Sequence, residues 1–243
     1  MGDLADYHGY PQFVATSLGL TLTNAACPGE TSASFLNVTA PDDGCHEGRT
    51  AKPIPLPLFV AYSSTSQSQL DYAVAFLRAN LKTGLVTITI GGDDLLLLEA
   101  QCTTPSATAS QIETCELAGL GKVLAAFARN LTAIYLAIRF EARYQGPIVL
   151  ATYFSPDYTN LVEDLAIGEL NTVAFGLTAA FGGRVADVFT TFEHASVPAG
   201  GLPCEITPTA LAFLNTVPPG GCGDHPTVAG QQLIANLVVQ AVK

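Results

Sequence analysis

Three short stretches of the sequence hold the residues that could do chemistry. They are Cys-Pro-Gly-Glu-Thr at 27–31, Gly-Gly-Asp-Asp at 91–94 and Asp-His-Pro-Thr at 224–227. A histidine can accept and return a proton near neutral pH. A glycine lets a backbone N–H approach a developing negative charge without obstruction by a side chain. These residue types could serve proton transfer and the stabilisation of a developing negative charge.

The second stretch comes directly after an apolar, β-branched run at residues 85–90. Such a run, bounded by turn residues, predicts a strand that is buried on both faces of a sheet. In open α/β sheets, sites form beyond the carboxyl ends of the strands, and Asp93 and Asp94 fall at such a position. An ordinary strand-to-helix turn, with glycines that turn the chain and an aspartate that caps the helix, accounts for the same residues without any chemistry.

The composition bounds the class of protein and its partners. Of the 243 residues, 49% are hydrophobic and 13% are charged. No run approaches about 18 uninterrupted apolar residues, so no transmembrane helix is predicted. The net charge is −11 and the ten Lys and Arg residues are scattered, which argues against nucleic acid as a partner. No linker divides the chain, so we expect one domain over residues 1–243, whose oligomeric state the sequence does not indicate.

Six cysteines fall into three local pairs, each of which encloses a loop rich in Pro, Gly, Thr or Asp. The pairs are Cys27 and Cys45, Cys102 and Cys115, and Cys204 and Cys222. This arrangement suggests three disulfides in that order, although six cysteines allow many other connectivities. With no CxxC pair and only four histidines, a zinc site is the weaker interpretation. Disulfides indicate an oxidising compartment, so we expect a secreted protein.

Helical and strand patterns alternate along the chain. The periodicity predicts helices at 11–18, 67–81, 117–143, 161–180 and 227–242, and strands at 20–23, 85–90, 148–153 and 185–192. Residues 40–57, 102–115 and 197–224 are expected to be loops. The alternation is typical of a three-layer α/β/α sandwich with a mostly parallel sheet. The chain opens with a helix, whereas a doubly wound fold usually opens with a strand near the middle of the sheet.

Taken in order, the three stretches resemble the motifs of the secreted SGNH (GDSL-type) hydrolases, a family of esterases and lipases. The resemblance covers nearly the whole chain and implies a flavodoxin-like α/β/α fold that needs no cofactor and no metal. It implies that His225 is the general base and that Gly29 supplies an N–H to the oxyanion hole. Asp93 occupies the position of the family's oxyanion-hole asparagine. Substrates in the family include small esters, lipids and acetylated glycans, and the sequence does not choose among them.

The sequence departs from the family pattern in three places. The Gly-Asp-Ser nucleophile block is absent, because Gly2-Asp3 is followed by Leu4 and no apolar strand precedes it. An ionised carboxylate donates no hydrogen bond, so Asp93 would serve the oxyanion hole only when protonated. The family's usual acid, three residues before the histidine, falls on Cys222. A backbone carbonyl is therefore expected to orient His225, with Asp224 pointing elsewhere.

The first residues, at 1–6, are acidic and lack the apolar core of a signal peptide. The absence of this core, of the nucleophile block and of a first strand has one economical explanation: we expect the sequence to begin downstream of the true start. A sheet that lacks a central strand exposes unpaired edges.

Other polar residues near the motifs have ordinary structural interpretations. Ser32 and Ser34 closely follow Gly29, but hydroxyl groups at the start of a helix are expected to cap it rather than act as nucleophiles. Asp94 is expected to accept N–H bonds that tie loops together. Two adjacent carboxylates are poor evidence for a metal site without further ligands.

Two functions from different classes follow. The first is carboxylic-ester hydrolysis by serine acyl transfer, with this chain inactive as given because the nucleophile block is absent. The second is a non-catalytic or degenerate SGNH-like domain that binds an ester or glycan ligand. The presence of a serine beside His225 distinguishes the two.

Overall fold

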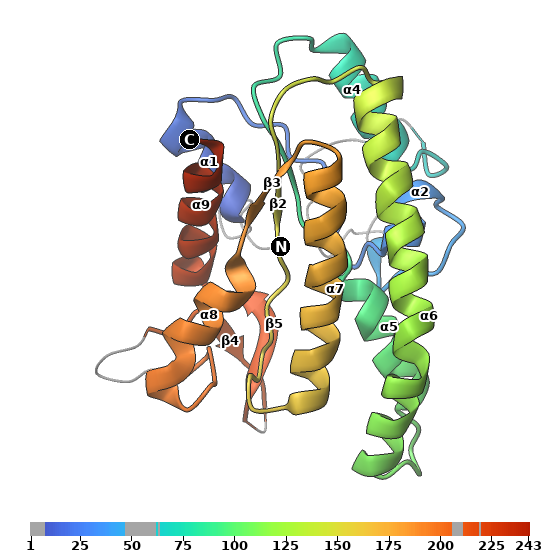
Figure 1. Cartoon of the computed structure of the whole chain (residues 1–243), viewed down its shortest axis with the longest axis vertical. Helices are drawn as coiled ribbons and strands as arrows, with labels where there is room; N and C mark the ends of the chain where they lie inside the picture. Colours follow the sequence, from blue (N-terminus) through green and yellow to red (C-terminus); the bar gives the residue numbers. More distant parts are fainter. Residues whose placement is uncertain (1–7, 47–61, 63, 206–210, 219) are drawn as a thin grey trace.

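The computed structural model describes residues 8–46, 62, 64–205, 211–218 and 220–243. The central sheet of this part of the chain has three parallel strands, in the order β1 (Val86–Ile88), β2 (Ile148–Ala151) and β3 (Arg184–Ala186). Helices cover both faces of the sheet (Figure 1). The α/β/α architecture with a mostly parallel sheet is therefore confirmed.

The described helices and the remaining strands follow the sheet's connections. The helices are α1 (Tyr10–Leu18), α2 (Ser32–Leu36), α4 (Gln69–Ala79), α5 (Gly92–Cys102), α6 (Ala109–Leu136), α7 (Leu161–Ala180), α8 (Val188–Ser196) and α9 (Val228–Val242). A π-helical turn, η2 (Ala137–Glu141), extends α6, and a 3₁₀ turn, η3 (Val197–Ala199), follows α8. An antiparallel hairpin of β4 (Leu214–Thr216) and β5 (Cys222–Pro226) precedes α9.

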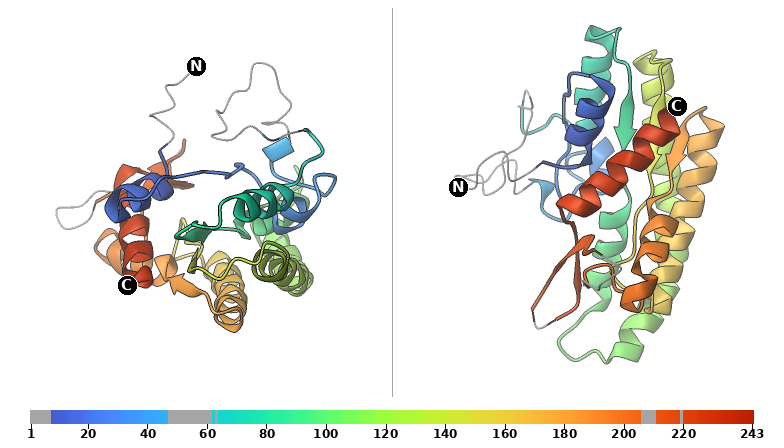
Figure 2. Two further views of the ribbon diagram at one scale, coloured as in Figure 1. Left: turned by 90° about the horizontal axis from the view of Figure 1, so that it is seen from above. Right: turned by 90° about the vertical axis from the view of Figure 1, so that its left-hand side faces the viewer.

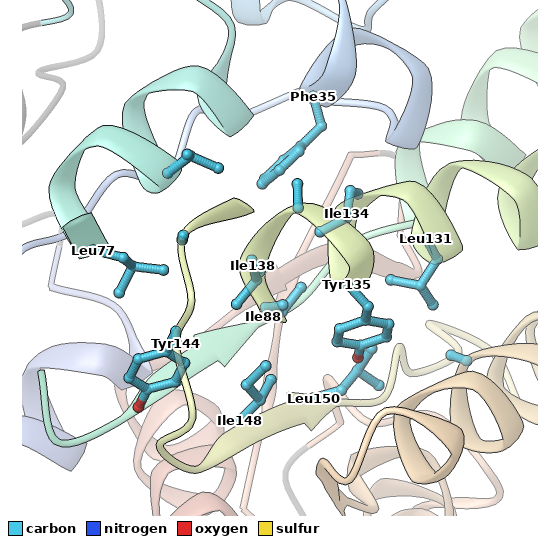
Figure 3. Close-up of a cluster of buried hydrophobic side chains, with 14 of the residues drawn as sticks. Phe35, Leu77, Ile88, Leu131, Ile134, Tyr135, Ile138, Tyr144, Ile148 and Leu150 are labelled. Carbon is cyan, nitrogen blue, oxygen red and sulfur yellow. The ribbon is translucent and has the colours of Figure 1, made fainter. Parts of the chain in front are cut away.

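The alternation of side chains along β2 divides the core into two layers. Successive side chains of a strand point to opposite faces, so Ile148 and Leu150 face one layer and Val149 and Ala151 the other. Ile148 and Leu150 join a cluster under α4, α6 and α7, which Figure 3 shows together with Phe35 and Tyr135. Residues of β2 are all buried, as a strand with helices on both faces requires.

The second layer packs under α1, α8 and α9. Val149 and Ala151 contact a cluster that includes Val14 of α1, Phe192 of α8 and Val238 of α9. Figure 2 shows α1 and α9 side by side on this face, with α4, α6 and α7 on the other face of the sheet. The two layers fix β2 at the centre of the structure.

Side-chain caps set where several helices begin. Ser68, Thr108 and Thr227 each accept a hydrogen bond from a backbone N–H in the first turn of α4, α6 and α9. Such caps satisfy N–H groups that have no partner within the helix. The cap at Thr108 starts α6 within the region expected to be a loop at 102–115, so Cys115 lies on a helix. The cap at Thr227 starts α9 at the boundary that the sequence predicts.

Two of the expected strands differ in the structure. Residues 20–23 alternate in hydropathy but form no strand, because no neighbouring strand of the described residues pairs with them; Leu20 and Leu22 are 41% and 37% exposed. The strand expected at 185–192 ends at Ala186, because Asp187 caps α8 by accepting a hydrogen bond from the N–H of Thr190 at 3.1 Å.

β1 and the last cysteine loop also differ from expectation. β1 is only partly buried, rather than buried on both faces, because β2 is its single partner in the described sheet. The region expected to be a loop at 197–224 contains β4 and the start of β5. The six cysteines pair in the expected order: Cys27–Cys45, Cys102–Cys115 and Cys204–Cys222.

One described helix, Ala109–Glu141, is long and apolar enough to cross a membrane by length and composition, although the sequence contains no long uninterrupted apolar run. The core helix of a soluble protein passes the same test. In this structure α6 packs along α5 and α7, and Phe127, Leu131 and Ile134 are fully buried in the first core layer.

We predict that Leu150→Ala lowers the free energy of unfolding by about 2–5 kcal/mol, because Leu150 is 1% exposed and its loss leaves a cavity between β2 and α7. Urea unfolding followed by circular dichroism measures this. Leu161→Ala is the matched control, because Leu161 is 79% exposed, and it should change stability by less than about 0.5 kcal/mol. Equal losses in the two variants would contradict the layer assignment.

Candidate active site

The turn at Gly29 presents a free backbone N–H. Gly29 has a φ of +79°, and a Cβ at this position would collide with the carbonyl oxygen of Asp43. The N–H of Asp43 donates to the Gly29 carbonyl at 2.8 Å, and the Cys27–Cys45 disulfide closes the same loop. The N–H of Gly29 itself makes no hydrogen bond within the described residues. Only glycine fits this turn, and its N–H is available to a ligand.

Asp94 ties the Gly29 loop to the end of β1. Both carboxylate oxygens of Asp94 accept hydrogen bonds from Ser32, one from its N–H at 2.7 Å and one from its hydroxyl at 2.6 Å. Asn130 of α6 donates to the same hydroxyl at 3.0 Å. Asp94 therefore joins loops as expected. Ser32 is 0% exposed and fully bonded, so its hydroxyl is not placed to attack a substrate.

Ser34 has a capping role as well. Its N–H donates to the Thr31 hydroxyl at 3.0 Å, and its own hydroxyl oxygen accepts the N–H of Thr31 at 3.0 Å. This reciprocal pair forms a capping box at the start of α2. Ser34 is buried. Neither serine near Gly29 is a nucleophile in this geometry.

Two glycines let the chain turn from β1 into α5. Gly91 has a φ of +111°, and a Cβ on it would clash with Phe127. A Cβ on Gly92 would collide with the ring of Tyr153, which follows β2. The turn places Asp93 in the first turn of α5. Because this segment packs against Tyr153, Asp93 is partly buried.

The pKa of Asp93 is raised to about 7. Burial is the largest cause, and the negative charges of Asp43, Asp94 and Asp224 add to it. A neighbouring carboxylate disfavours ionisation, and so does loss of solvent. Near neutral pH a large fraction of Asp93 is therefore protonated and able to donate a hydrogen bond. This is the state that an oxyanion-hole role at this position requires.

His225 stands at the end of β5 with its side chain 81% exposed. Its N–H donates to the Asn215 side chain at 3.0 Å, which fixes the backbone but leaves the ring free. Nε2 of the ring lies 3.9 Å from Oδ1 of Asp224. The expectation of a carbonyl that orients the ring is not met in the described residues, and Asp224 lies beside the ring rather than pointing elsewhere, because both residues lie on the exposed hairpin.

The carboxyl end of β1 is where these segments meet. Asp43 belongs to the Gly29 loop and Asp224 precedes His225, and the charge of each raises the pKa of Asp93. Burial raises the pKa of Tyr153, and the negative charges of Asp93, Asp224 and Asp43 raise it further. Asp43, Tyr153 and Asn215 were not singled out as site residues, because only the fold brings their loops here.

A groove of about 1200 Å³ runs from this end along β1. His225 and Pro28 line one part of it, and residues 20–26 and 85–89 line its length. Among the described residues, no Asp or Glu lines the groove, and Lys82 is its single lysine. No described serine lines it either, and none is hydrogen-bonded to His225.

The described residues offer one cluster with the donor types of a metal site, Cys27, Glu30 and Cys45. The two cysteines form a disulfide, so neither supplies the thiolate that a metal would need. The cluster holds the Gly29 loop together and does not fit a metal.

We predict that Asp93→Asn raises the free energy of unfolding at pH 8 by roughly 1–2 kcal/mol. This is less than the full pKa shift implies, because Asp93 is partly exposed and solvent screens its charge. Asp93 ionises near pH 4 when unfolded but only near pH 7 when folded, so the native protein loses stability as pH rises through this window. The benefit should be much smaller at pH 4, where the folded state is protonated and the unfolded state is only about half ionised. Thermal unfolding at both pH values measures it.

The matched control for this prediction is Glu169→Gln, a carboxylate on the exposed side of α7. It should show no comparable pH-dependent gain. A gain in Asp93→Asn that is equal at pH 4 and pH 8 would mean that the ionisation of Asp93 does not control stability.

Comparison with known proteins identifies the fold. No family model and no curated protein sequence matches the chain. Among solved structures it is similar to an extracellular lipase from Streptomyces rimosus, with 21% identity over 96% of this chain and 86% of that chain and a TM-score of 0.56. It is also similar to phospholipase A1 from Streptomyces albidoflavus NA297, with 17% identity over 95% and 86% and a TM-score of 0.53. The chain thus shares the hydrolase fold that its motifs suggested.

Proposed function

We propose that the chain provides the base and the oxyanion hole of a secreted carboxylic-ester hydrolase that acts by serine acyl transfer. The observation that carries the proposal is the meeting of the Gly29 loop, Asp93 and the His225 hairpin at the carboxyl end of β1. Three disulfides and the likeness to an extracellular lipase support an extracellular location.

Each residue has a defined role in this proposal. His225 accepts the proton of an attacking hydroxyl and returns it to the leaving alcohol. The free N–H of Gly29 and the protonated carboxyl of Asp93 donate to the oxyanion of the tetrahedral intermediate. Asp224, beside the His225 ring, stabilises the imidazolium that forms after proton transfer. No cofactor or metal takes part.

The described residues do not supply the serine. No serine is hydrogen-bonded to His225, and Ser32 and Ser34 are buried and engaged elsewhere. The hydroxyl must therefore reach His225 from a segment placed at the end of the groove. The same observation favours the second function, a non-catalytic domain that binds an ester or glycan, if no such segment exists in the working protein.

We predict that the chain as given hydrolyses p-nitrophenyl butyrate no faster than the buffer does. A variant with an apolar strand ending in Gly-Asp-Ser ahead of residue 1 should gain at least about 100-fold over the same extension ending in Gly-Asp-Ala. His225→Ala should abolish this gain, because the proposal makes His225 the base that activates the serine. His194→Ala, an exposed histidine on α8, is the matched control and should keep it.

The outcomes separate the two functions. A folded serine variant that binds substrate but does not hydrolyse it would favour the binding domain. Hydrolysis by the unmodified chain that depends on His225 would mean that a residue already present is the nucleophile. Comparing p-nitrophenyl butyrate with p-nitrophenyl palmitate and acetylated xylan then assigns the ester to the small, lipid or glycan class.

We predict that the activity of the serine variant falls as pH rises above about 7, because Asp93 loses the proton that it donates to the oxyanion. Asp93→Asn should abolish this alkaline loss, since an amide donates at every pH. A pH profile of kcat/KM between pH 6 and 9 measures both. An unchanged alkaline limb in Asp93→Asn would remove Asp93 from the oxyanion hole.

A further inference from the structure

β1 has an open edge. Its pairing with β2 uses the backbone groups of Val86 and Ile88, and the N–H of Val86 donates to the Pro147 carbonyl at 3.0 Å. Because backbone groups alternate in direction along a strand, those of Thr87 point away from β2. They make no hydrogen bond within the described residues. One side of β1 therefore presents free donors and acceptors to the groove.

The opposite rim of the groove has the same property. Residues 20–23 have the alternating pattern of a strand, and the backbone groups of Thr21, Leu22 and Thr23 make no hydrogen bond within the described residues. Both this segment and β1 line the groove, but no hydrogen bond joins them. Two segments whose backbone groups have no partners among the described residues thus face one space.

The other walls of the groove are apolar and aromatic. Tyr10 and Val14 of α1 line it on one face of the sheet, and Tyr72 and Phe76 of α4 line it from the other. Thr89 donates its hydroxyl to the Tyr10 phenol at 3.1 Å, which holds the Tyr10 ring over β1. A volume of about 1200 Å³ between these walls is ample for a peptide segment.

We propose that this groove accepts an extended, uncharged peptide segment that inserts between β1 and residues 20–23 as an additional strand. A strand of five to six residues, about 17–20 Å long, pairs its backbone with both rims while its side chains fill the two apolar walls. An acyl chain fills the same space but leaves the backbone groups of Thr87 and Leu22 unpaired. The described residues that line the groove include no Asp or Glu, which favours an uncharged partner over a basic one.

This proposal concerns binding alone and does not depend on the proposed ester hydrolysis. Its readout is binding by the chain as it exists, without substrate. The peptide probe carries no serine, so its binding tests the docking alone, and the ester hydrolysis is tested separately with the Gly-Asp-Ser variant.

The probe is the peptide acetyl-Trp-Thr-Val-Ile-Val-Thr-Gly-amide. The protein contains no Trp, so the emission of the peptide Trp reports only on the peptide. We expect a saturable blue shift on titration with protein, as the ring leaves water. The same peptide with N-methyl groups on alternate amides keeps its side chains but loses donors along one edge, and it should bind at least about tenfold more weakly.

Two outcomes with the probes would overturn the proposal. One is equal binding of the plain and N-methylated peptides, which would mean that the groove selects apolar side chains and not a strand. The other is displacement of the peptide by a fatty acid with an affinity equal to or higher than that of the peptide, which would make the groove an acyl site.

A pair of variants tests the rim itself. Thr87→Pro removes the N–H that faces the groove, while the bonds of Val86 and Ile88 to β2 are kept, so peptide affinity should fall at least about tenfold. Thr87→Val keeps the N–H and the β-branched side chain, so it should bind as the parent does. Equal binding by folded Thr87→Pro would overturn the proposal, and the N-methylated peptide gives the same test if that variant does not fold.

Discussion

The backbone of a strand must be hydrogen-bonded on both edges or leave one edge to water, and within the described residues β1 is bonded on one edge only. Much else in the structure depends on this constraint. The strand is half-buried despite an apolar, β-branched sequence, and residues 20–23 have no strand partner among the described residues. The groove of about 1200 Å³ is the space between these two segments, and it leads to the carboxyl end of β1.

The residues of the candidate site are held to very different degrees. The Gly29 loop is fixed by a disulfide, by the bond to Asp43 and by the two bonds from Ser32 to Asp94. Asp93 is fixed by the turn that packs on Tyr153. His225 by contrast lies on a short hairpin with its ring exposed and only Asp224 beside it. The Gly29 and Asp93 part of the proposed site is thus held firmly, whereas no hydroxyl of the described residues is hydrogen-bonded to the His225 ring.

Much of the fold was predictable from the sequence, and the exceptions have physical causes. Apolar periodicity located α4, α7 and α9 closely, because each buries one stripe and starts at a side-chain cap. It failed at residues 20–23, because a strand needs a partner and the sequence does not show whether one is present. It also missed β4 and β5, because their surroundings are rich in Pro and Gly. These two strands pair with each other beside the Cys204–Cys222 disulfide.

The candidate site was predictable in its residue types but not in its electrostatics. Gly29, Asp93 and His225 follow from short motifs, and Asp94 from its place at the start of α5. The raised pKa of Asp93 depends on Asp43 and Asp224, which lie 50 and 131 positions away and come near only through the fold. Unpaired edges in the sheet were expected, but not at β1 in particular, and the groove beside β1 depends on the positions of α1 and α4.

The most direct test of the account is amide hydrogen exchange along β1 in the free protein, measured residue by residue by NMR. An open edge predicts alternation: the amides of Val86 and Ile88, bonded to β2, are protected, while that of Thr87 exchanges rapidly. Equal, strong protection of all three amides would show that β1 already has a second partner, and would contradict the open groove on which the account depends.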